Sequence, residues 1–167
     1  MEQLSQLADI PAALLTSLYH QLAKLLQRAN TTMFASAVYI YLDLETGVMT
    51  ASTAGHPHPI ILGPDGVART MPLPKGIALG LLDDATYHNV QFSLLAGSRI
   101  LMYTDGLTEA ANQDGEEMGV ERLIDYFNNS SPHSTKYFVH QALTCVAKFT
   151  GCTNQADDIC MLGINYS

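Results

Sequence analysis

Positive charge is scarce in this sequence. Only 8 of its 167 residues are Lys or Arg, against 16 Asp or Glu, which gives a formal net charge of −8. A surface that binds nucleic acid needs clustered Lys and Arg to neutralise phosphates. The composition therefore argues against nucleic acid as a partner.

Cysteine and long apolar runs are scarce as well. The three cysteines, Cys145, Cys152 and Cys160, cannot all pair and form no Cys-x-x-Cys motif. We therefore expect reduced cysteines that act as small apolar residues, in a cytoplasmic protein. No apolar run approaches the roughly 18 residues that a membrane-spanning helix needs. The first residues also lack the basic and apolar regions of a signal peptide, so we predict no association with a membrane.

Length and composition favour one folded domain. Hydrophobic residues make up 47% of the chain, which is ordinary for a globular protein and too high for a disordered one. The sequence contains no repeats, low-complexity tracts or linkers. We predict a single domain over residues 1–167.

Hydrophobic periodicity predicts helices and strands in alternation. Leucines at three- and four-residue intervals predict an amphipathic helix over residues 11–27, and Pro11 suits its first turn. Glycine-containing turns predict two β-hairpins, one over 34–53 and one over 59–69. The remaining predictions are an irregular loop over 71–80, strands over 87–94, 100–104 and 159–164, and helices over 119–128 and 134–149.

Two of the predicted strands have acidic residues at one end. The run ILMYT at 100–104 is followed by Asp105 and Gly106, and the run ICMLGI at 159–164 is preceded by Asp157 and Asp158. A single Asp-Gly is most often only a turn. Two such strand ends side by side would instead provide a carboxylate site for Mg²⁺ or Mn²⁺.

The order of short motifs along the chain gives these aspartates a context. The sequence reads AGHP at 54–57, LG at 79–80, YTDGLTEA at 103–110, GVERL at 119–123 and DDI at 157–159. This ordered set resembles the SpoIIE/RsbU type of metal-dependent serine/threonine phosphatase, a branch of the PPM family. The resemblance extends from about residue 34 to residue 164, and the stretch 103–110 is its most specific part.

The resemblance implies an α+β fold and a set of metal ligands. The fold is a PPM-like α-β-β-α sandwich of antiparallel sheets flanked by helices, with two Mg²⁺ or Mn²⁺ ions at one end. Asp105 and Asp157 match aspartates that bind metal in the family, and Asp158 occupies the adjacent motif position. No protein nucleophile is implied, because a metal-activated water attacks the phosphate.

Three further residues are expected around these ligands: Gly106, His56 and Glu109. His56 has no second His or Cys at ligand spacing, so a structural hydrogen bond in a loop beside the site is favoured over metal ligation. For Glu109, a role beside the metal site and simple solvation of the turn after Asp105 both remain open.

One family motif is missing from the chain. The family's domain opens with strands and a GD-x-x-G-x-G motif whose aspartate bridges the two metals, and this sequence contains no such motif. We therefore predict an N-terminally incomplete domain, the C-terminal portion of the family's domain, that holds at most one metal ion. A longer parent polypeptide would explain the missing strands.

Two functions from different classes follow. The first is hydrolysis of phosphoserine or phosphothreonine on a regulatory protein, of the anti-sigma-factor-antagonist type that the family acts on. The second is a catalytically impaired PPM-like module that binds a partner protein in bacterial signalling. Because missing strands would leave a sheet edge and an apolar face uncovered, we also predict a homodimer.

Overall fold

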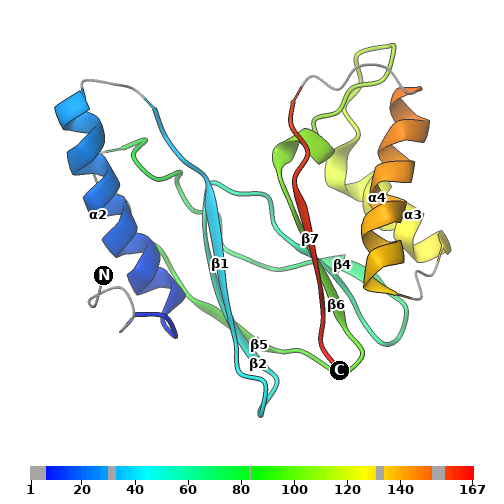
Figure 1. The fold of residues 1–167 in the computed structure, drawn as a ribbon, viewed down its shortest axis with the longest axis horizontal. Coiled ribbons are helices and arrows are strands. Elements are labelled where there is room, and N and C mark those ends of the chain that lie inside the picture. Colours follow the sequence, from blue (N-terminus) through cyan, green and yellow to red (C-terminus); the bar gives the residue numbers. More distant parts are fainter. Residues whose placement is uncertain (1–6, 30–32, 83, 131–133, 152–156) are drawn as a thin grey trace. The chain divides into compact units, whose positions relative to one another are not determined.

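The computed structural model describes residues 7–29, 33–82, 84–130, 134–151 and 157–167. The chain forms two compact units, one of Met1–His58 with Pro72–Leu94 and the other of Pro59–Met71 with Leu95–Ser167 (Figure 1). Each unit contains one antiparallel sheet. With the three α-helices of the described residues, these sheets give the mixed α and β content that the sequence predicts.

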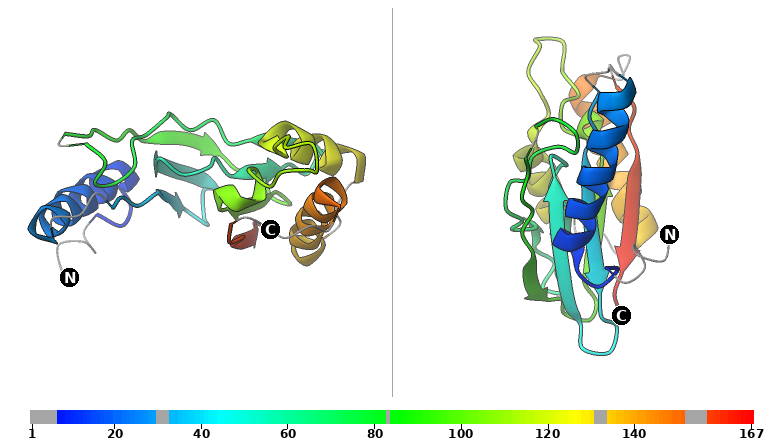
Figure 2. Two further views of the ribbon diagram at one scale, coloured as in Figure 1. Left: turned by 90° about the horizontal axis from the view of Figure 1, so that it is seen from above. Right: turned by 90° about the vertical axis from the view of Figure 1, so that its left-hand side faces the viewer.

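The first unit is a three-stranded sheet with a helix on one face. Its strands are β1 (Ala37–Leu42), β2 (Val48–Ala54) and β5 (Val90–Ser93), in the order β1-β2-β5. The helix α2 (Pro11–Ala29) runs along the sheet, as both Figure 1 and Figure 2 show. It begins at Pro11 because that residue lacks an N–H, which a first-turn position does not need.

The core of the first unit lies between α2 and the sheet. Leu15 and Tyr19 are each 1% exposed and pack with Ala54 of β2. The Tyr19 hydroxyl donates a hydrogen bond to the Leu82 carbonyl, and the Tyr87 hydroxyl donates one to the Ile77 carbonyl at 2.9 Å. These aromatic side chains therefore attach the irregular loop before β5 to the helix and sheet.

The second unit is a four-stranded sheet that supports two helices. Its strands run in the order β4-β3-β6-β7, with bounds Ala68–Thr70, Ile60–Leu62, Arg99–Tyr103 and Met161–Asn165. The helices are α3 (Gly119–Ser130) and α4 (Thr135–Thr150), and a 3-10 turn η1 (Asp105–Leu107) follows β6. The Ser134 side chain accepts the Tyr137 N–H at 3.2 Å and so caps α4.

The core of the second unit is separate from that of the first. Leu101 and Tyr103 of β6 point to the same side as Ile60 and pack against Leu123 and Phe127 of α3. In β7, a Cβ on Gly163 would lie 2.6 Å from Thr135 Cγ2 and 2.8 Å from Val139 Cγ2. Glycine at this position therefore lets α4 approach β7 closely.

The predicted elements all occur, with shifted boundaries. The first hairpin strand begins at Ala37 rather than at 34, because Ala35 instead forms a single bridge with Leu79. The strand predicted over 87–94 is confined to Val90–Ser93, since Tyr87 belongs to the core under α2. The residues beyond the turn at 96–98 form β6, which lies in a different sheet from β5.

The expectation for cysteine is only partly right. Cys145 is buried, as expected of a small apolar residue, but Cys160 is exposed, so the prediction is wrong there. Cys160 precedes β7, and its N–H and carbonyl form hydrogen bonds with Thr104. Cys152 lies outside the described residues.

Candidate functional site

The acidic ends of two strands lie next to each other in the second unit. Strands β6 and β7 pair in antiparallel fashion with Tyr103 opposite Met161 (Figure 1). The C-terminal end of β6 therefore adjoins the N-terminal end of β7. Asp105 follows the first end, and Asp157 and Asp158 precede the second. The juxtaposition that the sequence analysis requires is present in the structure.

Thr104 joins these two segments. Its hydroxyl donates to the Asp158 carbonyl at 3.0 Å and accepts the Cys160 N–H at 2.9 Å, and its own N–H donates to the Cys160 carbonyl at 3.0 Å. The residue directly before Asp105 thus fixes the path of residues 158–160.

Gly106 leaves room for the segment that carries the other aspartates. A Cβ on Gly106 would lie 2.7 Å from the Asp158 carbonyl oxygen, 3.2 Å from its carbon and 3.4 Å from the Asp157 carbonyl carbon. The first distance is below any ordinary contact, so a side chain here would displace backbone. Glycine after Asp105 is therefore required by packing.

Asp105 and Asp157 are held in the same local way. Asp105 Oδ1 accepts the N–H of Gly106 at 3.1 Å, and Asp157 Oδ1 accepts the N–H of Asp158 at 2.8 Å. Both side chains are exposed. No hydrogen bond between described residues involves the Oδ2 atom of either, so each presents an oxygen to solvent. Asp158 contributes its carbonyl to Thr104, and its exposed carboxylate has no such hydrogen bond.

The donor set suits a hard divalent cation but is small. Carboxylate oxygens are the ligands that Mg²⁺ and Mn²⁺ prefer. Among the residues that the structure describes, no group of three or more His, Cys, Asp or Glu side chains is arranged to hold a metal ion. Asp105 with Asp157 would leave most coordination positions to water.

Glu109 lies one turn beyond Asp105. The N–H groups of Glu109 and Thr108 both donate to the Asp105 carbonyl at 2.8 Å. The turn η1 therefore places the Glu109 backbone next to that of Asp105. The Glu109 carboxylate is exposed. On the other side of Asp105, burial raises the pKa of the Tyr103 phenol to about 12, and Glu121 adds to the effect, so Tyr103 is neutral.

His56 lies in the first unit, in the loop after β2. Its Nδ1 is 2.9 Å from Ser36 Oγ, and its carbonyl accepts a hydrogen bond from Thr53 Oγ1 at 3.3 Å. Gly55 before it adopts a left-handed conformation with φ of 65° and donates to the Gly76 carbonyl at 2.8 Å. These bonds support the structural role that the sequence analysis favours for His56.

Two residues of these loops were not singled out from the sequence. Thr104 was quoted only as part of the YTDGLTEA motif, and the signal was present there because a hydroxyl residue directly precedes the Asp-Gly pair. Ser36 has no such signal, because no sequence pattern connects it to His56, twenty residues away.

Comparison with known proteins identifies the family. The family model described as Stage II sporulation protein E (SpoIIE) matches residues 1–167. The chain belongs to the SpoIIE family. Protein IcfG of Synechocystis sp. is 24% identical over 138 residues, which are 83% of this chain but only 22% of IcfG.

Solved structures agree on the fold of this SpoIIE-family chain. The SiaA-PP2C domain of Pseudomonas aeruginosa superimposes with a TM-score of 0.73 at 23% identity, over 94% of this chain and 61% of that one. The catalytic domain of the serine threonine protein phosphatase PstP, in complex with two manganese ions, gives a TM-score of 0.64 at 14% identity, over 94% and 69%. The PPM-like fold with two antiparallel sheets and flanking helices is therefore confirmed. The chain spans less than two thirds of IcfG and of the SiaA structure.

The helices of the described residues are too short or too polar to cross a bilayer. The domain count of one, the metal ligands and the cytoplasmic location stay predictions.

Proposed function

We propose that this chain is part of a PPM-type phosphatase domain that hydrolyses phosphoserine or phosphothreonine on a regulatory protein. The observation that carries the proposal is the Thr104 and Gly106 arrangement, which brings Asp157 and Asp158 against the Asp105 loop. Neither residue is needed for a simple turn. Both are explained if the two acidic segments must stay together.

Asp105 and Asp157 are the residues we assign to a bound Mg²⁺ or Mn²⁺. Both carboxylates have one oxygen held by the next backbone N–H, and the other oxygen has no hydrogen bond among the described residues. Asp158 is the weaker candidate because it occupies the position next to the aspartate that matches the family's ligand. The cation would supply charge neutralisation at the phosphoryl oxygens and a lowered pKa for water.

The protein's own contribution is to hold the acidic segments around Asp105 and Asp157 in place. Thr104 and Gly106 hold the two acidic segments together, which keeps the backbones of Asp105 and Asp157 close to each other. We assign Gly106 and His56 no direct part in phosphate hydrolysis. We place Glu109 at the edge of the metal site because it is exposed one turn after Asp105.

The second candidate function is a PPM-like module that binds a partner without catalysis. It is favoured by the small donor set, since no three ligating side chains among the described residues are arranged to hold a metal ion. With at most one ion, the arrangement that orients a nucleophilic water would be incomplete.

The deciding experiment is Mn²⁺-dependent hydrolysis of a phosphoserine peptide, with Asp105→Asn and Asp114→Asn compared. Asp114 is an exposed aspartate of the same unit that lies outside the site, so its loss controls for charge. Turnover that disappears only in Asp105→Asn supports the phosphatase. If neither the wild type nor the variants show turnover, but Mn²⁺ binding depends on Asp105, the binding module is supported. Turnover unaffected by Asp105→Asn contradicts the assigned site.

For the partner, we propose a phosphorylated anti-sigma-factor antagonist or a similar regulatory protein, as the family resemblance implies, and a second copy of this chain. Within the described residues, β1 and β7 each have a strand on one side only. Leu162 on β7 is 55% exposed. Such edges favour pairing with another strand, and a clean monomer by light scattering of a concentrated sample would contradict the homodimer.

A further inference from the structure

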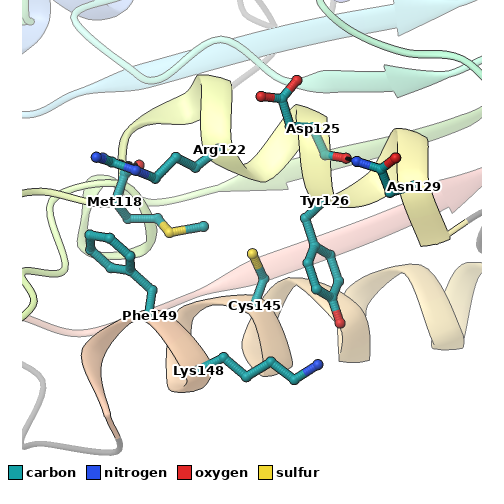
Figure 3. Close-up of a pocket in the computed structure, with 8 residues that line it drawn as sticks. All are labelled: Met118, Arg122, Asp125, Tyr126, Asn129, Cys145, Lys148 and Phe149. Atoms are coloured by element: carbon teal, nitrogen blue, oxygen red, sulfur yellow. Dashed lines mark hydrogen bonds between the residues drawn. The ribbon is translucent and has the colours of Figure 1, made fainter.

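An open surface pocket, called the cavity below, lies between α3 and α4 of the second unit (Figure 3). Its volume is about 360 Å³. The residues that line it are Met118, Arg122, Asp125, Tyr126, Asn129, Cys145, Lys148 and Phe149. Those on each helix recur at three- and four-residue intervals, so they form one face of α3 and one face of α4. The volume is in the range of small-molecule sites, about 300 to 1,000 Å³.

The interior of the cavity is apolar. Met118 is 1% exposed and Cys145 is 7% exposed. Figure 3 shows Met118 and Phe149 at one end, the Tyr126 ring at the other and the Cys145 thiol between them. Burial raises the pKa of the Cys145 thiol to about 11, with Lys148 opposing part of the effect, so the thiol is uncharged at neutral pH. A ligand would therefore meet sulfur and aromatic surface along its length.

The cavity also carries positive charge, in a chain with a net charge of −8. The Arg122 guanidinium lies 5.0 Å from the centre of the Phe149 ring, and Lys148 Nζ lies 5.5 Å from the centre of the Tyr126 ring. Two of the chain's eight basic residues thus border one cavity. Each packs over an aromatic ring, which keeps the charge next to apolar surface.

The two cations differ in what they already bind. Arg122 donates to the Glu117 and Met118 carbonyls at 2.6 and 3.2 Å and lies 3.5 Å from the Glu116 carboxylate. Lys148 forms no ion pair with any described residue.

The one acidic residue of the cavity lining does not neutralise Lys148. Figure 3 shows the Asp125 carboxylate directed away from Cys145. Lys148 is therefore the charge available to a ligand.

We propose that this cavity binds a small amphipathic anion. Its acidic head group meets Lys148, and its aliphatic or aromatic body lies along Cys145 toward Met118 and Phe149. A neutral apolar ligand would gain nothing from the exposed Lys148 charge, and a cationic ligand would be repelled by Lys148 and Arg122. The proposal is independent of the phosphatase assignment, because no residue of the Asp105 site lines the cavity.

Three probes with the same alkyl group test the charge class: octanoate, octanol and octylammonium, each below its solubility limit and below any micelle concentration. The readout is the rate at which iodoacetamide alkylates Cys145, followed by peptide mass spectrometry. A bound probe slows the reaction by the factor 1 + [L]/Kd, about threefold at twice the Kd. Exposed Cys160 is the internal reference, and its rate should not change.

Octanoate is expected to protect Cys145 at a lower concentration than octanol, and octylammonium is expected to give no protection. Equal protection by all three probes would show purely apolar binding and overturn the anion assignment. No protection by octanoate would overturn the site itself.

Lys148→Met tests the head-group contact, with Lys136→Met as its matched control. Lys136 is exposed on the first turn of the same helix and does not line the cavity, so both variants change the net charge equally. Loss of the Lys148 charge should weaken octanoate binding about three- to tenfold, measured by equilibrium dialysis, and leave octanol unchanged. Equal effects of the two variants would overturn the contact.

Discussion

Replacement of Gly106 by alanine tests how the two acidic segments are held together. The new Cβ would lie 2.7 Å from the Asp158 carbonyl oxygen, so the backbone of one segment must move by about 0.7 Å to restore an ordinary contact. Gly106 is not in a left-handed conformation, so alanine adds no dihedral strain there. Overpacking of this kind costs about 1 to 3 kcal/mol, which lowers the melting temperature of a chain of this size by about 2 to 12 °C.

The displacement should be local and visible without any activity. The amides of Thr104 and Cys160 donate across the junction between the two segments. If the segments separate, hydrogen exchange at these two amides should accelerate roughly five- to a hundredfold, whereas amides in α2 should be unaffected. Mn²⁺ affinity and any phosphatase activity of the same variant should fall, since a displacement approaching 1 Å is enough to spoil a metal or reaction geometry.

Gly115→Ala is the control for this variant. Gly115 has φ of 81° and would have no atom within 4 Å of a Cβ. Its replacement costs roughly 1 to 2 kcal/mol of backbone strain but brings no collision. A Gly106→Ala protein with unchanged exchange at Thr104 and Cys160 would refute the argument that glycine is needed for this approach.

Three further substitutions give expected outcomes from other contacts. Thr104→Val removes the hydroxyl that bridges to residues 158 and 160 and should cost about 1 kcal/mol by denaturant unfolding, whereas Thr104→Ser should retain most of the stability. Gly163→Ala should cost about 1 to 3 kcal/mol because of the close approach of α4, and Val139→Ala should recover part of this loss in a double-mutant cycle; strict additivity would contradict the contact. The pKa of Asp43 lies below its ordinary value of 3.8 because the backbone N–H groups of residues 46 and 45 bind its carboxylate. The ionised carboxylate therefore stabilises the fold fully above pH 3.8, and this stabilisation is lost as the pH falls through the lowered pKa. Asp43→Asn should therefore be less stable than the wild type at pH 7, with a difference that closes below pH 3.8, and a difference independent of pH would contradict it.

The sequence predicted the elements well because their signals are local. The leucine spacing of α2 and the glycine turns of the hairpins act within a few residues, and these elements appear where expected. The strand over 87–94 was too long because alternation cannot distinguish a sheet residue from one such as Tyr87, whose side chain is buried against α2. The adjacency of Asp105 and Asp157 was predictable from strand ends and the family resemblance. The hydrogen bonds of the Thr104 hydroxyl were not predictable, because they connect Thr104 to Asp158 and Cys160, which lie 54 and 56 positions further along the chain.

The position of β7 links the candidate site to any partner of the sheet. Asp157 and Asp158 precede β7, and among the described strands β7 pairs only with β6. On one face, β7 also packs against α4, which approaches it closely at Gly163. A strand added to the open edge of β7, from a second copy or from another protein, would stabilise β7 and with it the segment that Thr104 already holds beside Asp105.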